Sequence, residues 1–286
     1  MTARLPVVVA LIVHHAPLTP ADRVGVLQCL SILKSHPVVA VAPEGLPLPR
    51  FLRHLRTERF PDGFFRSVRD YNRLMLSPEF YARFEAYDQL LIHQLDTFVF
   101  RDELLAWCAR GSDYVGAPWQ GVRFPDSSEW IELLHAFMPA GSAEQWRGRM
   151  RVGNGGFSLR RVKPLRHILE SRPQWLRIWG DRHEDAFWGI AARLALSEAE
   201  CRIPSEEEAL GFAFETQPAE CYRCLGRLPF GCHAWDRMSP AFWRPWIRKA
   251  GWRVHVPGDG GWQDRVAAGA TRVKQLLSAK AMQGAG

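Results

Sequence analysis

Four short segments of the chain carry groups that could do chemistry. Asp96 follows an apolar stretch, and a carboxylate there could hold Mg²⁺ or Mn²⁺, which prefer oxygen ligands. Three glycines within 153–156 leave the backbone open to close approach by a bulky ligand. Glu184 and Asp185 are adjacent acids, and a carboxylate held in a cleft can act as a general base. His233 lies among Gly, Pro and aromatic residues and could complete a metal site.

Each segment also has a purely structural explanation. Asp96 could cap the residues that follow it, and the glycines fit an ordinary hairpin turn. Adjacent acids stabilise the first turn of a helix through its dipole. A single His is more often a hydrogen-bonded structural residue than a ligand. On these residues alone, both interpretations stay open.

The surrounding pattern predicts an α/β fold that brings these segments to one edge of a sheet. The apolar run Val7–Val13 predicts a buried strand, the Thr19-Pro20 pair begins a helix, and 38–42 is a second strand. This βαβ unit predicts a parallel sheet, with ligands bound beyond the carboxyl ends of the strands. A third strand, 87–93, runs directly toward Asp96. Other strands are expected at 113–118 and, after a glycine turn, within 151–159, and helices at 67–81, from 102, at 162–170 and at 184–196.

The order of the segments resembles that of the GT-A glycosyltransferases. The similarity is closest to a bacterial and eukaryotic family of initially unassigned function, and it extends over roughly residues 5–236. Five blocks carry it: QLDTFVFRDEL at 94–104, DYVGAPW at 113–119, GNGGFSLR at 153–160, EDAF at 184–187 and PFGCHAW at 229–235. The resemblance implies a GT-A-like α/β/α sandwich with a mixed, mostly parallel central sheet.

The resemblance also implies roles for single residues. Asp96 matches the last acid of the motif that holds the metal and the donor diphosphate, although Gln94 replaces the first acid of that motif. His233 matches a late metal ligand, so a divalent cofactor, Mn²⁺ or Mg²⁺, is expected. Asp185 matches the catalytic base of inverting relatives, and Glu184 beside it would bind sugar hydroxyls. Six residues are expected to bind the donor: Arg69, Asn72, Gln94, Asn154, Gly155 and Gly156.

Composition and charge narrow the class of protein. The 286 residues carry a net charge of +7, and 12 of them are Trp, which suits stacking on sugar rings without being specific for it. From Arg237 onward nine Lys and Arg stand against Asp259 and Asp264. We therefore expect a transferase domain at 1–236 and a basic, Trp- and Arg-rich extension at 237–286, with an amphipathic helix suited to peripheral contact with an anionic membrane. A solvated basic surface, or packing of the extension on the enzyme's own core, is the alternative.

The sequence as a whole predicts a metal-assisted, inverting transferase that moves a hexose from a nucleoside-diphosphate sugar, expected to be UDP-linked, to a saccharide or other hydroxyl acceptor. No apolar run approaches the ~20 residues that span a bilayer, and no export signal is recognisable, so a cytoplasmic location is expected. No specific nucleic acid is expected as a partner. Two alternatives remain: a retaining transferase, in which Asp185 would not be the base, and a non-catalytic protein that binds glycans or nucleic acid on a degenerate transferase scaffold.

Overall fold

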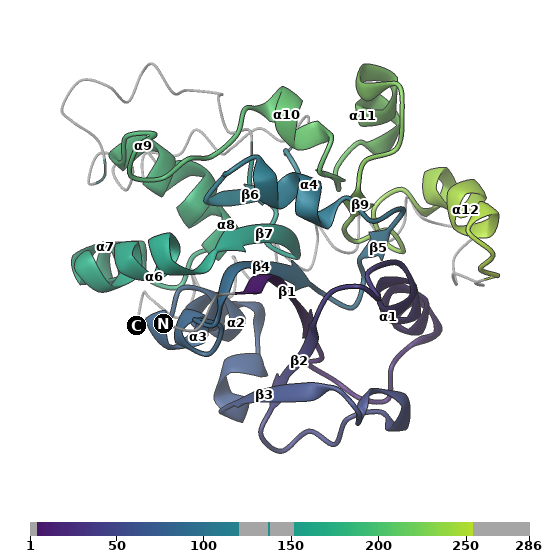
Figure 1. Ribbon diagram of the computed structural model, residues 1–286, viewed down its shortest axis with the longest axis horizontal. Helices are drawn as coiled ribbons and strands as arrows, with labels where there is room; N and C mark the ends of the chain where they lie inside the picture. The colour runs from purple at the N-terminus through teal and green to yellow at the C-terminus, as the bar shows by residue number, and fades with distance from the viewer. Residues whose placement is uncertain (1–4, 120–136, 138–151, 254–286) are drawn as a thin grey trace, which may run out of the picture. The chain divides into compact units, whose positions relative to one another are not determined.

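The computed structural model describes residues 5–119, 137 and 152–253, shown in colour in Figure 1. The chain divides into two compact units, Met1–Arg253 and Val254–Gly286. The second unit lies outside the described residues, and so does the amphipathic helix expected within it. None of the helices in the described ranges combines the length and apolar character needed to cross a membrane.

A six-stranded mixed sheet forms the centre of the first unit. Its order is β3-β2-β1-β4-β7-β6, and every strand except β7 runs in the same direction. The predicted α/β fold with a mixed, mostly parallel central sheet is therefore confirmed. The strands are β1 (Leu5–Ile12), β2 (Val38–Pro43), β3 (Arg56–Phe60), β4 (Tyr87–His93), β6 (Tyr114–Gly116) and β7 (Phe157–Arg161).

Helices cover both faces of this sheet. In Figure 1, α1 lies to the right of the sheet and α3, α6 and α7 to its left, with α3 packed against α6. β1 is buried from Val7 to Ile12 because both of its faces are covered. The helices around the sheet are α1 (Pro20–Ile32), α2 (Val68–Met75), α3 (Pro78–Ala82), α4 (Leu104–Ala109), α6 (Val162–Ser171) and α7 (Pro173–Trp179). Short 3₁₀ turns lie at Arg50–Leu52 and Asp62–Phe65.

A second, smaller sheet lies beyond the carboxyl end of β4. It has the order β5-β9-β8, and each strand has only two residues: β5 (Phe98–Val99), β8 (Ala213–Phe214) and β9 (Gly231–Cys232). β8 and β9 are parallel, and β5 is antiparallel to β9. This sheet carries into one place three segments that are far apart in the sequence, at residues 96, 215 and 233.

Two predicted helices differ in detail from the observed ones. The single helix predicted at 67–81 is wrong: Ser77 accepts a hydrogen bond from the Glu79 amide and caps a new helix, α3, because Pro78 has no N–H with which to continue α2. The helix predicted at 184–196 is present as α8 (Glu184–Ala186), a π-helical turn (Phe187–Ala192) and α9 (Arg193–Ala195). The predicted helix start at Thr19 is confirmed as a capping box with Asp22.

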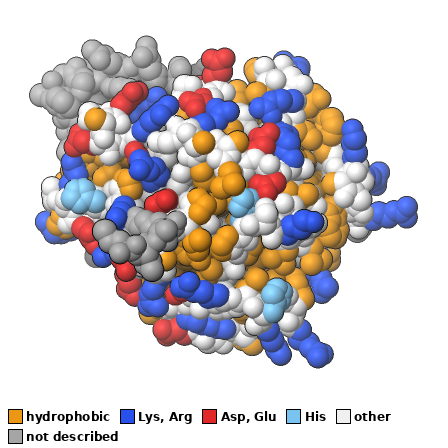
Figure 2. Space-filling view, in the orientation of Figure 1, with side chains coloured by type: hydrophobic (Ala, Val, Ile, Leu, Met, Phe, Trp, Pro, Cys, Tyr) orange, Lys and Arg blue, Asp and Glu red, His pale blue; other side chains and the backbone are white. Residues whose placement is uncertain are grey.

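The start of the predicted extension belongs to the first unit, where α12 (Pro240–Lys249) packs on the rest of that unit. Trp243 is fully buried and stacks on Phe100, at 5.7 Å between ring centroids, and the Trp252 indole N–H donates to Gln28. These two Trp side chains serve internal packing, while Arg248 and Lys249 are exposed. Figure 2 shows hydrophobic side chains gathered in the middle of the face viewed, with Lys and Arg around its edge. The remaining helices are α10 (Glu206–Leu210) and α11 (Pro218–Leu225).

Candidate active site

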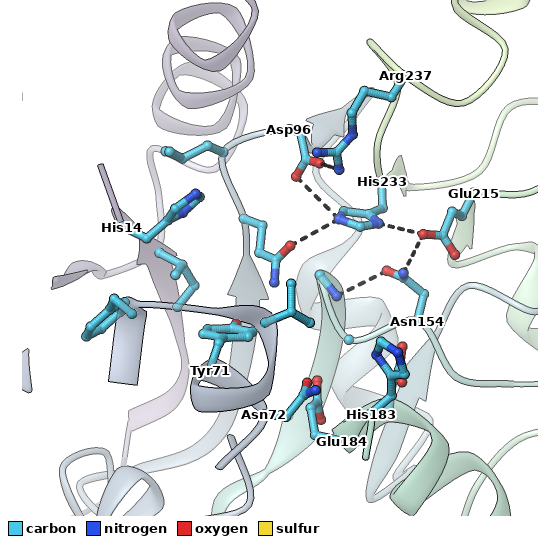
Figure 3. A pocket seen from close by; sticks show the side chains of 18 of the residues that line it. His14, Tyr71, Asn72, Asp96, Asn154, His183, Glu184, Glu215, His233 and Arg237 are labelled. Atoms are coloured by element: carbon cyan, nitrogen blue, oxygen red, sulfur yellow. Dashed lines mark hydrogen bonds and ion pairs between the residues drawn. The ribbon is translucent and has the colours of Figure 1, made fainter. Parts of the chain in front are cut away.

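A cavity of about 850 Å³ opens at the carboxyl ends of β1 and β4. Because β7 runs antiparallel to β4, the glycine turn that precedes β7 lies at this same edge of the sheet. The start of α8 and the ends of β8 and β9 complete the walls. Figure 3 shows Asp96, His233 and Arg237 on one side of the cavity and His183 and Glu184 on another, with Asn154 between them. The lining residues used below are Asn72, Gln94, Asp96, Asn154, Gly155, Gly156, Glu184, Asp185, Glu215, His233 and Arg237.

Asp96 and His233, the two predicted metal ligands, are brought together. Asp96 Oδ1 lies 3.3 Å from His233 Nε2, and Arg237 forms an ion pair with Asp96 Oδ2. Burial raises the pKa of Asp96, but the charges of His233 and Arg237 and the hydrogen bond from His233 outweigh burial and hold the pKa well below its usual range. Burial likewise lowers the pKa of His233, but Asp96 and Glu215 outweigh it and raise the pKa to about 10.

In the described part of the chain, no three His, Cys, Asp or Glu side chains form a group suited to a metal ion. Asp96 and His233 could share a cation only as a pair, with phosphate oxygens of a bound nucleotide supplying further ligands. Such a cation would require His233 Nε2 to be free of its proton. Within these conditions the donor set fits Mn²⁺ or Mg²⁺.

The glycine turn is packed so closely that side chains at its centre would collide with the site. A Cβ on Gly155 would lie 1.8 Å from Glu184 Oε1, and a Cβ on Gly156 would lie 2.2 Å from His233 Nε2. A backbone hydrogen bond joins the turn to the end of β4: the main-chain N–H of Gln94 donates to the Gly156 carbonyl at 2.9 Å. The two glycines therefore allow the backbone of the turn to lie close to the Glu184 carboxylate and to the His233 ring.

Glu184 and Asp185 occupy different environments, although both line the cavity. Glu184 is 3% exposed, and its Oε1 accepts from the fully buried Arg160 guanidinium at 2.8 Å, while its buried Oε2 has no hydrogen-bond partner among the described residues. Burial raises the pKa of Glu184 despite the opposing charge of Arg160. Asp185 Oδ1 accepts from the Ala186 amide at 2.7 Å, and burial raises the Asp185 pKa in spite of this bond.

Of the other predicted donor-binding residues, Gln94 and Asn72 line the cavity and Arg69 does not. Gln94 Oε1 lies 3.1 Å from His233 Nε2, and Asn72 is 6% exposed in the cavity wall. Arg69 does not line the cavity, and its guanidinium pairs with Asp181. A nucleotide contact by Arg69 therefore stays a prediction that would need this ion pair to open.

Residues 54–233 match the family described as "Protein of unknown function (DUF5672)". The chain belongs to this family. No curated protein matches the sequence.

Among solved structures, the chain is similar to glycosyltransferases. An active-site mutant of LgtC has 15% identity and a TM-score of 0.48, over 88% of this chain and 98% of that one. The galactosyltransferase LgtC in complex with donor and acceptor sugar analogues has 14% identity and a TM-score of 0.44 over the same shares. The mannosyltransferase Ktr4p from S. cerevisiae in complex with GDP has 10% identity and a TM-score of 0.40, over 72% of this chain and 68% of that one. These likenesses concern the fold alone.

Three residues of the site were missed in the sequence. Arg160 lies inside the GNGGFSLR block, and its position two residues after Ser158 on a strand places both on one face, which could have indicated a buried role. Arg237 follows the PFGCHAW block by only two residues. Glu215 had no local signal, because its neighbourhood depends on the pairing of β8 with β9.

Proposed function

We propose that this protein is a glycosyltransferase that moves a hexose from a nucleoside-diphosphate sugar, UDP-linked, to a hydroxyl acceptor. One observation carries the proposal: Asp96 and His233 face a single cavity with the glycine turn 154–156 and the acids Glu184 and Asp185. A donor needs a site for its diphosphate, a surface for its sugar and an acid or base near the anomeric carbon. The cavity offers a candidate for each.

The diphosphate would bind beside Asp96, His233 and Arg237. A divalent cation held by Asp96 and His233 would neutralise the charge that develops on the departing nucleotide. Arg237 would exchange its bond to Asp96 for a phosphate oxygen, since a guanidinium binds either anion well. Two features favour the non-catalytic alternative: Arg237 already pairs with Asp96, and Gln94 replaces an acid. Such a site could hold a nucleotide without metal or turnover.

Asp185 would act as the general base. Its carboxylate would take the proton of the acceptor hydroxyl as that oxygen attacks the anomeric carbon, and the bond from the anomeric carbon to the diphosphate oxygen would break. This single displacement inverts the anomeric configuration. The raised pKa of Asp185 suits the role, because a carboxylate with a higher pKa is a stronger proton acceptor. Glu184 Oε2 would accept a hydrogen bond from a sugar hydroxyl.

The proposal is tested by thermal unfolding with UDP, GDP and ADP, each with and without Mn²⁺. A ligand at about 100 times its Kd stabilises the folded state by ~2.7 kcal/mol. At ~2–4 °C per kcal/mol for a chain of this size, the Tm should rise by about 5–10 °C with UDP and Mn²⁺. Asp96→Asn is the matched variant, and its Tm should no longer respond to Mn²⁺. If no nucleoside diphosphate raises the Tm, the proposed donor class is wrong.

A further inference from the structure

Glu215 lines the cavity, and one of its two carboxylate oxygens accepts hydrogen bonds from two parts of the site. Its Oε1 accepts from His233 Nδ1 at 2.8 Å and from Asn154 Nδ2 at 2.7 Å. Its side chain is 15% exposed, so water does not readily replace either bond. His233 belongs to the wall that faces Asp96, whereas Asn154 begins the glycine turn. Figure 3 shows the Glu215 carboxylate beside both residues, with both bonds drawn.

The small second sheet explains why Glu215 reaches His233. β8 and β9 are parallel, with Phe214 opposite Cys232, so the next residue of each strand leaves the sheet side by side with the other. The His233 amide donates to the Phe214 carbonyl at 3.0 Å, which fixes this neighbouring position. The backbone pairing of β8 and β9 therefore places Glu215 and His233 next to each other.

On the other side, Glu215 orients the Asn154 amide. A carboxylate oxygen accepts from Nδ2, so the Asn154 side chain must turn its Oδ1 the other way. That oxygen accepts from the Gly156 amide at 3.1 Å and from the Phe157 amide at 3.3 Å. The orientation of one side-chain amide therefore holds the glycine turn closed.

Glu215 also fixes the His233 ring. With Nδ1–H donating to Glu215, Nε2 faces Asp96 and Gln94. The ring packs against Gly156, where even a Cβ would lie 2.2 Å from Nε2. A small rotation of the ring would therefore disturb the turn, and a shift of the turn would disturb the ring.

We propose that Glu215 is a positioning residue that locks the glycine turn and His233 into one unit by serving as their shared hydrogen-bond acceptor. It would act on the donor through these two groups, so this step rests on the proposed function. A shared acceptor, rather than a charge, is the requirement. The amide oxygen of a Gln at position 215 can accept both bonds, whereas a Met fills similar space and can accept neither effectively.

The first experiment compares Glu215→Gln, Glu215→Met and the surface control Glu220→Gln by calorimetric titration with UDP and Mn²⁺. Glu220 pairs with Arg223 on α11 and does not line the cavity. Glu215→Met should weaken UDP binding about 10- to 100-fold, the usual effect of removing a partner that orients a ligand-binding His. Glu215→Gln should stay within about 3-fold of the wild type, since both bonds remain. Wild-type affinity in Glu215→Met, or an equal loss in Glu215→Gln, would overturn the proposal.

A second experiment decides the role of Glu215 without any ligand. In the free protein, amide hydrogen exchange at Gly156 and Phe157 should be about 10-fold faster or more in Glu215→Met and in Asn154→Ala. The double variant should exchange no faster than Asn154→Ala, because both substitutions break the same chain of bonds. If the two effects multiply, or if Glu215→Met exchanges like the wild type, Glu215 does not hold the turn. If the wild type binds no UDP, the proposed function is wrong. The exchange rates still test whether Glu215 holds the glycine turn, because they are measured without ligand.

Discussion

The substitution Gly155→Ala tests how tightly the glycine turn is fitted to the acids beneath it. An added Cβ would stand 1.8 Å from Glu184 Oε1, and no ordinary carbon–oxygen contact is that short. The carboxylate would have to move by about 1.5 Å to reach van der Waals distance. Its bond to Arg160 Nη2 is 2.8 Å long, so a movement of that size away from the turn breaks it.

The magnitude follows from the burial of the pair. Arg160 is fully buried and Glu184 is 3% exposed, and separating such a pair costs ~3–5 kcal/mol, while overpacking alone costs ~1–3 kcal/mol. Taking about 3 kcal/mol, and ~2–4 °C per kcal/mol, the Tm should fall by about 6–12 °C. The displaced carboxylate would also leave the proposed sugar site, so donor turnover should fall with stability.

The assay is thermal unfolding of Gly155→Ala beside Gly63→Ala. Gly63 is a matched control, because a Cβ there meets nothing within 4 Å and its backbone φ lies outside the left-handed region that favours glycine. Gly63→Ala should keep the wild-type Tm to within about 2 °C. A Gly155→Ala protein as stable as this control would refute the close fit of turn and carboxylate.

Three further predictions concern the charged groups of the cavity. Asp185→Asn should lower turnover by roughly 10²- to 10⁴-fold while UDP affinity stays near that of the wild type. Glu184→Gln should instead raise the KM for the donor. Equal effects of the two substitutions in steady-state kinetics would contradict the division of roles. Because burial raises the pKa of Asp185, turnover should decline as pH falls through a value above the ordinary 3.8 of an Asp, and a rate independent of pH down to that value would exclude it as the base. His233 has a folded-state pKa of about 10, above its ordinary 6.5, so its stabilising charge is fully present below pH 6.5 and lost as pH rises toward 10. Urea unfolding should therefore show a fall in stability across this window that is smaller in His233→Gln, and parallel curves for the two proteins would contradict the assignment.

The parts of the fold that could be predicted are those encoded in local runs. Tyr87–His93 is a strand with the predicted bounds, and Val38–Pro43 extends its prediction by one residue, because consecutive apolar and β-branched residues mark a strand buried on both faces. The two-residue strands of the second sheet give no such run. Their pairing rests on contacts between residues 98, 214 and 232, which no local pattern encodes.

The candidate site was predictable where a residue type and its place at a strand end or helix start coincide. Asp96, after one predicted strand, and Gly156, before another, are of this kind, and the structure brings them to one cavity. His233, which lies in the same cavity, was expected from the resemblance and not from a predicted strand end. Glu215 is different, because its role depends on β8 lying beside β9. The raised pKa of Asp185 also could not be predicted from its position at a helix start, because the burial that raises it is a tertiary property.

Turnover of a nucleotide sugar with water as acceptor measures whether this protein is an inverting transferase with Asp185 as its base. Purified protein with Mn²⁺ and each of several UDP-hexoses should release UDP from at least one, and Asp185→Asn should abolish most of that release. Proton NMR of the freed sugar, taken before mutarotation, should show the anomer opposite to that of the donor. If no UDP-hexose is cleaved, or if the released sugar keeps the donor's configuration and Asp185→Asn is fully active, the account of an inverting transferase with Asp185 as its base is contradicted.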